Sequence, residues 1–595
     1  MSTRRSKDVL TPIETKPHVR KIAALDLEGA GGVDSFVSAS IVDGQRKVFT
    51  KSRDTLFDEM FSKRYRGTHF YVHYLSYDFG MMLPFIPLPF KAYLVRGKVY
   101  RVVISDGNKH TFYLNDSLGM FYNLALSVVG NAIGLPKLPT PPEFTSDAKV
   151  VPEWRCEEHD QKWCPKCYNV RDAEIVYRAM IMYQDTMLSL GSEVRNTLAS
   201  TAMTLFRRSF LDREYVKPFP YRNEFARLAY YGGRVEPFIW GETSRQNYYD
   251  FHSLYAAMMH NHPYPDPDTF VGPWENRDIR FIFEYEGFSE VMVKCPSMHI
   301  PILPYRHKGK LYFPKGTMRG VWAHCELRYA VSLGYQIKAI YRTMFAKGTC
   351  NPFVSYVDAL WSLRQEAKGR GDQREVIYKT MANSLYGKFG QRSESGLDQL
   401  FRLEDIDEDA DLTGYQMMEI LDCVYVRKPL GGSDEPAYVI VPWAAYTTAY
   451  GRIRLHQAMQ RADFQVSYTD TDSIFTSLVL PTSSGLGELG VVDTDLQLQV
   501  YAPKFYRYVT PQGKERIACR GVPAEYRAQY ISTKEVAFQK AVGIYEAAVR
   551  NLTPSEWITT TRHMRYADPK RDYYRIRGSP QGLWQSRAWA VEHLP

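Results

Sequence analysis

The chain has 595 residues, of which 45% are hydrophobic and 24% are charged. At roughly 150 residues per domain, this length corresponds to about four domains or fewer large ones. The composition excludes disordered, collagen-like and disulfide-scaffold proteins. Lysine and arginine number 75 against 66 acidic residues, so the net charge of +9 is compatible with a polyanionic partner without establishing one.

The sequence contains no convincing membrane span. Its most apolar run, residues 81–90, includes three prolines and is shorter than the roughly 18 residues that a span requires. The basic amino terminus lacks a following apolar stretch, which argues against a signal peptide. Eight cysteines are too few for a disulfide framework and favour a reducing compartment. We therefore expect a cytoplasmic protein without a membrane partner.

Acidic residues follow predicted strands and open a predicted helix within the first 190 residues. Asp26 and Glu28 end a strand-like run and lie two positions apart, so their side chains share one face. A tyrosine and an aspartate four positions apart begin a helical stretch and also share one face. A further aspartate follows a second strand-like run. The set is Asp26, Glu28, Asp78, Tyr168 and Asp172. Ordinary surface acids are the alternative interpretation.

Four potential metal ligands lie just before that helix, in the pattern Cys156-x2-His159-x4-Cys164-x2-Cys167. They form two pairs, each with the spacing of a zinc knuckle. Because four protein ligands complete a tetrahedral shell, the pattern predicts a structural zinc ion and not a catalytic one. Free thiols in a surface loop are the alternative.

Three aspartates farther along the chain are candidates for a second acidic site. Asp250 ends a strand-like run before a helical segment. Asp470 and Asp472 lie in a short turn between apolar runs, as in a hairpin that carries acids at its tip. Most aspartate pairs are solvated turns, so the significance of these residues depends on what else surrounds them.

Cationic and polar side chains with helical spacing supply that context. Lys379, Asn383 and Tyr386 are spaced 0, +4 and +7, which places them on one helix face. Arg364 and Lys368 are four apart and precede a Gly-Arg-Gly turn. Two helices joined at this turn would direct three cations towards one polyphosphate, although each group alone is also typical of a solvated face. Carboxylates for divalent metal together with cations for a triphosphate indicate nucleotidyl transfer.

The segments that carry these residues resemble motifs A, B and C of family B DNA polymerases. They are DFHSLYA (250–256), KTMANSLYG (379–387) and YTDTDS (468–473). Further segments resemble motifs of the protein-primed subgroup, found in bacteriophages and linear plasmids: Tyr230-Tyr231-Gly232-Gly233, Lys504-Phe505-Tyr506, and Ser117-Leu118 with Phe121. The resemblance spans roughly residues 22–525 in the family's order. One departure is Ala256, where the family usually has proline.

The resemblance implies a role for each matched residue. Asp250, Asp472 and the carbonyl of Phe251 would bind two Mg²⁺ ions, for which Mn²⁺ can substitute, and Asp470 would complete the acidic cluster. Tyr255 would exclude a ribose 2′-hydroxyl. The remaining nucleotide-binding residues would be Arg364, Lys368, Lys379, Asn383 and Tyr386, and the DNA-binding residues Ser117, Leu118, Tyr230, Gly232, Gly233, Lys504 and Tyr506.

The amino-terminal acids resemble the Exo motifs of 3′–5′ proofreading exonucleases, which use two metal ions to activate water. Asp26, Glu28, Asp78 and Asp172 would bind Mg²⁺, and Tyr168 would assist. Two positions depart from the family: Gly29 replaces a threonine and Tyr74 stands where an asparagine is expected. Since those family residues contact single-stranded DNA, we expect the metal chemistry to be retained and the grip on a frayed primer to differ.

The implied fold is a multidomain α/β and α+β protein, with a ribonuclease-H-like exonuclease domain followed by a right-hand polymerase. The expected divisions are the tail and exonuclease domain (1–193), palm (194–261 and 438–523), first insertion (262–350), fingers (351–390), second insertion (391–437) and thumb (524–595). The first insertion would contact a terminal protein, and the second would encircle the template and support strand displacement. Six acids lie within residues 404–411, in the second insertion, where a solvated tip is the simplest interpretation. The basic, aromatic stretch 562–587 suits a thumb on a phosphate backbone, with a solvated face as the alternative.

The predicted function is therefore that of a DNA-directed DNA polymerase with proofreading. Its partners would be template, primer, deoxynucleoside triphosphates and a separate terminal protein that supplies the priming hydroxyl, and the enzyme would be a monomer. A primer-independent polymerase-primase of the same superfamily is one alternative. A non-catalytic DNA-binding protein is another, but such a protein would have no need of the three aspartates.

Overall fold

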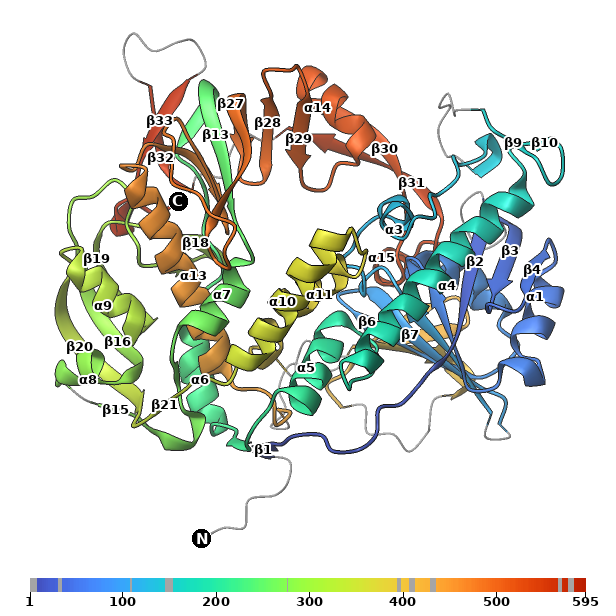
Figure 1. The fold of residues 1–595 in the computed structure, drawn as a ribbon, viewed down its shortest axis with the longest axis horizontal. Coiled ribbons are helices and arrows are strands. Elements are labelled where there is room, and N and C mark those ends of the chain that lie inside the picture. Colours follow the sequence, from blue (N-terminus) through green and yellow to red (C-terminus); the bar gives the residue numbers. More distant parts are fainter. Residues whose placement is uncertain are drawn as a thin grey trace.

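The computed structural model describes residues 8–29, 35–107, 110–144, 153–275, 277–392, 398–405, 413–427, 435–564, 570–575 and 583–595. Two large sheets dominate these residues, one of ten strands and one of nine. Figure 1 shows the ten-stranded sheet, built mainly from the blue amino-terminal part, on the right and the nine-stranded sheet at the upper left. The mixed α/β and α+β character predicted from the sequence is confirmed.

The amino-terminal sheet is centred on β2 (Lys21–Gly29), which is buried along almost its whole length. Burial on both faces explains why this strand has a continuous apolar run instead of alternation. It pairs in parallel with β5 (Thr68–Val72), which pairs in parallel with β8 (Thr111–Asp116). The long helix α4 (Pro165–Ser189) packs on β2 and β3. The other elements are α1 (Arg53–Met60), α2 (Leu75–Met82), α3 (Leu126–Ala132), β3 (Phe36–Val42), β4 (Lys47–Thr50), β6 (Phe90–Val95) and β7 (Lys98–Ser105).

A segment from much later in the chain extends this sheet. Strand β22 (Asp398–Arg402) pairs antiparallel with β6, and β24 (Cys423–Arg427) and β23 (Gln416–Ile420) continue the sheet outward. Leu400 and Tyr425 are part of the same apolar core as the amino-terminal strands. The described strands of the predicted second insertion therefore lie on the edge of the amino-terminal sheet.

The nine-stranded sheet brings together strands that are distant in the sequence. Its order is β12-β25-β26-β13-β27-β28-β29, with β33 also paired to β13. Helices α7 (Leu254–Asn261) and α13 (Val441–Arg461) contact each other beside it. The strands are β12 (Val235–Pro237), β13 (Ile239–Phe251), β25 (Val466–Asp470), β26 (Ser473–Thr476), β27 (Leu489–Ala502), β28 (Phe505–Val509) and β29 (Glu515–Cys519).

A smaller four-stranded sheet occupies most of the predicted first insertion. Its order is β15-β20-β16-β19, and helices α8 (Arg280–Glu284) and α9 (His324–Ser332) cover it. A buried ion pair between Glu326 on α9 and Arg452 on α13, with the guanidinium Nε 2.8 Å from the carboxylate, fixes it to the neighbouring helix. The strands are β15 (Phe270–Glu275), β16 (Glu286–Cys295), β19 (Gly316–Ala323) and β20 (Gln336–Ala346).

A helical pair lies between the two large sheets in Figure 1. Helix α10 (Val354–Arg370) ends where Gly371 adopts a left-handed conformation with φ of 66°, which glycine accepts without strain. The chain then returns through α11 (Glu375–Ser384) and α12 (Tyr386–Phe389). Helix α10 contacts α7, and α11 contacts α7 and α5 (Leu198–Ser209).

The carboxy-terminal segment connects the two large sheets. The hairpin of β30 (Glu535–Ala541) and β31 (Trp557–His563) carries α15 (Ile544–Arg550), whose Ile544 and Ala547 are buried in the amino-terminal core. Strands β32 (Asp572–Tyr574) and β33 (Trp584–Arg587) then return to β13. Figure 1 shows this red segment as an arch above the helical pair. Residues 524–595, predicted as one thumb, thus divide between the arch and the nine-stranded sheet.

Short elements complete the described fold. They are β1 (Val9–Leu10), β9 (Arg155–Cys156), β10 (Gln161–Lys162), β11 (Tyr215–Val216), α6 (Pro220–Leu228), β14 (Tyr264–Pro265), β17 (Tyr305–His307), β18 (Lys310–Tyr312), β21 (Thr349–Cys350) and α14 (Arg527–Thr533). Among the described residues, none of the helices combines the length and the apolarity needed to cross a membrane.

Candidate active sites

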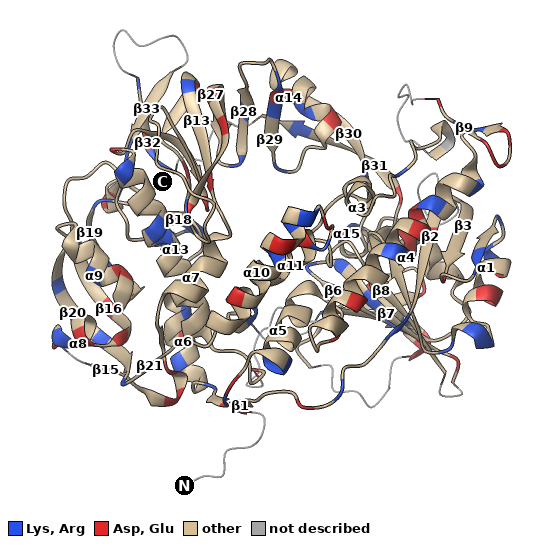
Figure 2. Cartoon of the chain, viewed as in Figure 1, with Lys and Arg blue, Asp and Glu red and all other residues tan. Residues whose placement is uncertain are grey.

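The central site is a cavity of about 740 Å³ between the nine-stranded sheet and the helical pair. Residues from all three polymerase-like motifs line it. They include Asp250, Phe251, Tyr255, Arg364, Lys379, Asn383, Tyr386, Asp470, Asp472, Lys504 and Tyr506. Figure 2 shows basic and acidic residues next to each other on α10 and α11, the helices that form one wall.

Strand pairing explains why the three aspartates meet. Asp250 at the end of β13 is in register with Ser473, the first residue of β26, so it lies beside the β25–β26 turn. The turn holds Asp472 through its backbone amide, which donates to the carbonyl of Asp470 at 2.7 Å. The carbonyl of Asp472 in turn accepts from the amide of Phe251 at 2.9 Å. The hairpin tip predicted from the sequence is confirmed.

The space around one of the two glycines before β12, Gly233, leaves no room for a side chain. A Cβ on Gly233 would lie 2.8 Å from Cγ2 of Thr471 and 3.0 Å from the hydroxyl of Tyr255. The carbonyl of Gly232 accepts from the buried guanidinium of Arg452 at 3.0 Å. Gly233 therefore allows the backbone to approach the acidic turn closely, whereas a Cβ on Gly232 would meet nothing within 4 Å.

Two of the aspartates carry the electrostatics expected of metal ligands. Burial, reinforced by the charge of Asp472, raises the pKa of Asp250 to about 7. Burial and the neighbouring Asp470 raise the pKa of Asp472 to about 6. One buried oxygen of Asp250, Oδ1, lacks a hydrogen-bond partner within the described part of the chain. Oxygen ligands that repel each other and are incompletely satisfied fit a divalent cation.

Asp470 is oriented differently from the other two aspartates. Its Oδ1 accepts from the Lys504 ammonium at 2.6 Å, and the Tyr468 hydroxyl lies 3.4 Å from Oδ2. In the described residues the three aspartates do not form a compact three-carboxylate cluster. Asp470 therefore orients Lys504 at the rim of the cavity, while Asp250 and Asp472 remain available to an ion.

The predicted cations lie opposite the acids, with one exception. Arg364 donates from Nε to Glu375 at 2.7 Å and from Nη1 to the Ser253 hydroxyl at 2.9 Å, so it is fixed at the cavity wall. Lys379 lines the same wall, whereas Lys368 does not reach it. All three nevertheless act on His252, since burial and their combined charge lower its pKa.

Aromatic rings form the floor of the cavity. The rings of Tyr255 and Tyr386 lie 4.6 Å apart at 38°, and Gly451 lies against the Tyr255 ring. Asn383 donates to the carbonyl of Lys379 at 3.1 Å, one turn earlier on α11. Tyr122, which is 63% exposed, enters from the amino-terminal part of the chain. The cavity is thus closed by two regions of the chain, one of them outside the polymerase-like motifs.

Several cavity residues were not predicted from the sequence, among them the polar side chains of Tyr122, His252, Ser253 and Glu375. His252 and Ser253 lie inside the DFHSLYA segment, and Glu375 precedes Lys379 by four positions on the same helix face, so these three had a local signal. Tyr122 had none. Ser117, by contrast, is buried away from the cavity, and its hydroxyl donates to the carbonyl of Val72 at 3.2 Å.

The amino-terminal site gathers three carboxylates on β2 and α4. One oxygen from each of Asp26, Glu28 and Asp172 lies within 4.8 Å of the others. Burial raises the pKa of Asp26 to about 6, and burial together with the charge of Asp26 raises the pKa of Glu28 well above its usual range. Asp172 keeps a buried Oδ1 without a described partner. These features again fit divalent metal ions.

The other predicted members of this site, Asp78 and Tyr168, lie outside the group of three carboxylates. Asp78 accepts the backbone amide of Leu27 at 2.9 Å, and burial and the charge of Asp26 raise its pKa. Tyr168 accepts from the ammonium of Lys137 at 2.8 Å, and the same ammonium contacts the Asp172 carboxylate. Lys137 was not predicted, because it comes from an irregular proline-rich loop that carries no periodic signal.

Packing explains one of the two positions that depart from the family, Gly29, but not the other, Tyr74. A Cβ on Gly29 would lie 2.7 Å from the Met81 sulfur and 2.9 Å from the Ser35 carbonyl oxygen, so packing leaves no room for a threonine. Tyr74 has a left-handed backbone with φ of 73° at the start of α2. The residues beside this site therefore differ from those of the family, whereas its carboxylates match the family pattern.

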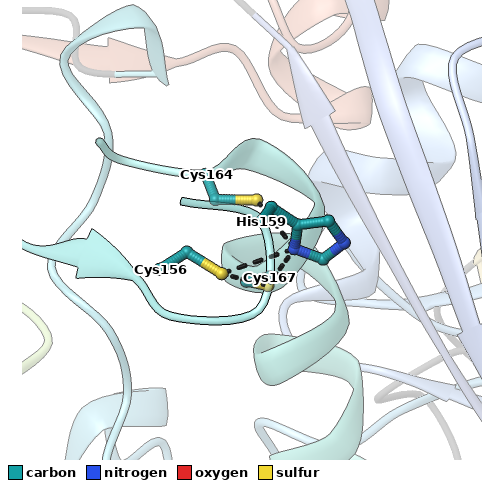
Figure 3. Close-up of side chains that lie close together, drawn as sticks. All are labelled: Cys156, His159, Cys164 and Cys167. Carbon is teal, nitrogen blue, oxygen red and sulfur yellow. Dashed lines mark hydrogen bonds between the residues drawn. The ribbon is translucent and has the colours of Figure 1, made fainter. Parts of the chain in front are cut away.

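The Cys–His cluster, defined as Cys156, His159, Cys164 and Cys167, lies at the start of α4. Figure 3 shows the three sulfur atoms around the imidazole, and Nδ1 of His159 is 3.4, 3.7 and 3.3 Å from the sulfurs of Cys156, Cys164 and Cys167. All four ligand atoms lie within 4.8 Å of one another. The four residues that the sequence pattern groups are thus brought together.

Two charged segments of the sequence are only partly described. Of the acids at 404–411, Glu404 and Asp405 are exposed on the edge of the amino-terminal sheet, whereas Asp407, Glu408, Asp409 and Asp411 lie outside the described residues. In the basic aromatic stretch, the Tyr573 hydroxyl donates to the Pro237 carbonyl at 2.8 Å, so this ring packs on the nine-stranded sheet. Tyr566 lies outside the described residues.

Comparison with known proteins identifies relatives over most of the chain. A family described as DNA polymerase type B, organellar and viral, matches residues 152–421. A probable DNA polymerase of Neurospora intermedia is 24% identical over 518 residues, which cover 76% of this chain and 52% of that protein. The DNA-directed DNA polymerase of Enterobacteria phage PRD1 is 27% identical over 369 residues, which cover 59% of this chain and 63% of that protein. The chain thus spans about half to two thirds of the length of these relatives.

The fold has a close counterpart among solved structures. Phi29 DNA polymerase complexed with primer-template DNA aligns with a TM-score of 0.69 at 16% identity, covering 92% of this chain and 100% of that one. The predicted fold, an exonuclease-type domain followed by palm, fingers and thumb, is confirmed. The resemblance to type B polymerases of viruses and organelles is confirmed as well.

Proposed function

From its likeness to the type B DNA polymerases of organelles and viruses, we propose that the chain is a DNA-directed DNA polymerase. The observation that carries this proposal is the cavity in which Asp250 and Asp472 face Arg364 and Lys379. Carboxylates on one wall suit divalent metal, and cations on the other suit the phosphates of an incoming nucleotide. A cavity with both is suited to nucleotidyl transfer.

The metals implied by the family would be two Mg²⁺ ions held by Asp250, Asp472 and the Phe251 carbonyl. When bound, they would lower the pKa of an attacking 3′-hydroxyl and stabilise charge at the α-phosphate. Arg364 is already oriented by Glu375 and Ser253, so its guanidinium loses little conformational entropy when it binds a phosphate oxygen. Lys504, oriented by Asp470, would bind the backbone of the primer strand.

The aromatic floor would select the nucleotide. Tyr255 is packed between Tyr386 and Gly451, so its ring has no free space into which to retreat from a 2′-hydroxyl. Tyr386 would lie against the nascent base pair, with Asn383 beside it on the same wall. We also propose that Lys368, which lies outside the cavity, acts only through its long-range charge.

We further propose that the amino-terminal site is a 3′–5′ exonuclease. Asp26, Glu28 and Asp172 would hold two Mg²⁺ ions that activate water, and Asp78 would hold the strand that carries the first two acids. Lys137 would keep the Tyr168 hydroxyl directed at the site. The mutual repulsion of the carboxylates supports this assignment, because a cation relieves it.

The finer proposals concern domains and partners. The fingers at 351–390 and the insertions at 262–350 and 391–437 are retained as drawn from the sequence, whereas the thumb predicted at 524–595 would be limited to the arch, since β32 and β33 belong to the nine-stranded sheet. The enzyme would act as a monomer in the cytoplasm of the host of a virus or linear plasmid. It would extend a hydroxyl supplied by a terminal protein and displace the non-template strand. The segments that resemble motifs of the protein-primed subgroup, Tyr230-Tyr231-Gly232-Gly233 and Lys504-Phe505-Tyr506, support the proposal of a terminal protein.

The polymerase assignment is tested by Asp472→Ala. Incorporation of a deoxynucleotide on a primed template should fall about a thousandfold, equivalent to about 4 kcal/mol of transition-state stabilisation. Excision of single-stranded DNA should stay within about twofold. Glu242→Ala, an exposed acid on β13 of the same sheet, is the matched control and should change neither rate. Equal loss of both activities in a folded variant would contradict two separate sites.

Protein priming needs a separate test, since elongation alone does not require it. The purified chain should extend an annealed DNA primer but should fail to start at the ends of linear duplex DNA when no other protein is present. Efficient end-to-end copying by the chain alone would contradict the proposed terminal protein. It would favour the primer-independent polymerase-primase instead.

A further inference from the structure

The loop that carries the Cys–His cluster has almost no apolar core of its own. Among residues 153–163 only Cys156 is buried, and the regular structure consists of β9 and β10, two residues each. Two positions in this short hairpin, Asp160 and Trp163, have left-handed backbones with φ of 46° and 44°. A two-stranded hairpin of this size is not stable in water without an additional constraint.

The sulfur–nitrogen separations in the cluster are close to those that a zinc ion requires, whereas one sulfur–sulfur separation is shorter. Sulfur and nitrogen ligands at about 2.0–2.3 Å from a tetrahedral centre lie about 3.5–3.8 Å from one another. The three sulfur–nitrogen distances around His159 are 3.3–3.7 Å, and the sulfurs of Cys156 and Cys167 are 3.1 Å apart. That last separation is well beyond the roughly 2.05 Å of a disulfide bond, and all eight cysteines are free thiols.

We propose that Cys156, His159, Cys164 and Cys167 bind one structural zinc ion through three thiolates and the Nδ1 atom of the imidazole. The ion would join the β9–β10 hairpin to the first turn of α4. Neither the polymerase nor the exonuclease reaction uses these side chains, and four protein ligands leave no open position for a substrate. The site is therefore a constraint on structure and not a third active site.

The position of the cluster gives the ion a consequence for the amino-terminal site. Cys164 is the N-cap of α4 and Cys167 lies in its first turn, directly before Tyr168. The next residue, Asn169, donates to Asp26 at 2.5 Å, and Asp172 follows one turn later. The zinc ion would thus fix the end of the helix that presents these groups to the acids on β2. Cys164 and Cys167 are positioning residues for the proposed exonuclease.

Further contacts link this loop and α4 to the segment that carries Lys137. Trp154 donates from its indole nitrogen to the carbonyl of Pro139 at 3.0 Å, and Thr140 accepts from the Tyr168 hydroxyl at 3.2 Å. Loss of the ion should therefore loosen the hairpin and the Lys137 loop together. The cavity of the polymerase-like site contains no residue of either segment.

Zinc binding itself is tested on the full chain, purified without chelator. Metal analysis should give about one zinc per chain, and Co²⁺ substitution should give the intense visible absorption of a tetrahedral cobalt–thiolate site. His159→Ala should lose both signals, and because His159 belongs to an exposed loop outside the apolar core the variant should still fold. His159→Cys should retain zinc through four thiolates. Cys350→Ser, outside the cluster, is the control and should retain it as well.

The positioning role rests on the proposed exonuclease and is read from the ratio of two rates. His159→Ala should lower excision of single-stranded DNA about tenfold to a hundredfold, the usual cost of a disturbed metal shell. Primer extension should stay within about twofold, and His159→Cys should restore excision. Equal excision by zinc-loaded and zinc-free protein would overturn the positioning role.

Different results would contradict the proposed metal site and the proposed exonuclease. Near-zero zinc in freshly purified protein, with eight titratable thiols, would overturn the metal site whatever the activities. Six titratable thiols without zinc would assign a disulfide to the cluster and would overturn it too. One zinc per chain with no excision in the unmodified protein would contradict the exonuclease proposal and leave the metal site standing.

Discussion

The two acidic sites differ in where their cation lies. In the amino-terminal site the ammonium of Lys137 lies among the acids, bound to Tyr168 and Asp172. In the central site Arg364 and Lys379 line the wall of a cavity of about 740 Å³ that the acids Asp250 and Asp472 also line. The cation of the first site therefore orders the acids and the tyrosine around it, whereas in the second site Lys379, and Arg364 held by Glu375 and Ser253, line a cavity with room for a ligand. This arrangement suits a nuclease that directs water at one phosphate and a polymerase that binds a triphosphate.

Burial gives the two sites a common property. It raises the pKa of Asp26 and of Asp472 to about 6 and that of Asp250 to about 7. Burial disfavours the charged form of each of these carboxyl groups, and a neighbouring carboxylate adds to the effect at Asp250 and Asp472. A bound divalent cation would favour the charged form. Similar acids would thus serve the two proposed reactions, and the surrounding cations and the cavity distinguish the two sites.

The largest effect expected from the comparison is the loss of excision alone. The double variant Asp26→Ala and Glu28→Ala removes two of the three clustered carboxylates. Excision of a single-stranded 3′ end should fall about a thousandfold, or about 4 kcal/mol, because the metal site is lost. Primer extension should change by less than about twofold. Glu14→Ala, an exposed acid in the same part of the chain, should leave both rates unchanged.

The next effect tests the cation among the acids. Lys137→Met keeps the length of the side chain but removes the ammonium that binds Tyr168 and Asp172. Excision should fall about tenfold to a hundredfold, since Tyr168 loses its donor and the acids lose a compensating charge. Extension should not change. If Lys137→Met excises as fast as the unmodified chain, the ammonium has no part in orienting the site.

A smaller effect is expected in the central cavity. Tyr255→Val removes the ring that packs against Tyr386 and should open space for a ribose hydroxyl. The ratio of ribonucleotide to deoxyribonucleotide incorporation should rise about tenfold, or about 1.4 kcal/mol, the scale of a steric discrimination in a pocket. Competition kinetics with matched nucleotides measure it. An unchanged ratio would place sugar selection at another residue.

The smallest effect concerns a family difference beside the amino-terminal site. Gly29→Thr restores the usual family residue, but its Cβ would meet the Met81 sulfur and the Ser35 carbonyl. We expect a loss of about 1–3 kcal/mol in the free energy of unfolding from overpacking and a few-fold decrease in excision. Thermal unfolding and excision assays measure both. A gain in excision without loss of stability would show that the site relaxes to accept a threonine.

Motif spacing and strand pairing coincide for most of the predicted carboxylates, whereas Asp78 and Asp470 are held by other contacts. Asp250 ends a strand and Asp472 lies in a hairpin turn, so local pattern alone indicated their presentation. The pattern was less informative for Lys368, whose helical spacing from Arg364 did not place it in the cavity. Lys368 lies one helical turn beyond Arg364, and this offset leaves it exposed and away from the cavity wall.

The rest depended on contacts between distant segments. Lys137 and Tyr122 enter their sites from irregular loops, for which no periodicity exists to be read. The pairing of β22 with β6 joins residues about 300 positions apart, and the return of β33 to β13 joins the carboxy terminus to the central strand. Such contacts follow from tertiary packing, and a single sequence carries no local signal for them.

The central claim, that one chain holds two independent metal-dependent sites with opposite reactions, is tested most directly on a primer with a mismatched 3′ end. With Mg²⁺ and all four deoxynucleoside triphosphates, the unmodified chain should first shorten the primer and then extend it to full length. Asp472→Ala should only shorten it, and an equal mixture of Asp472→Ala with the Asp26→Ala and Glu28→Ala double variant should restore full-length product. Failure of the mixture, with each variant folded and active on its own remaining reaction, would contradict independent sites.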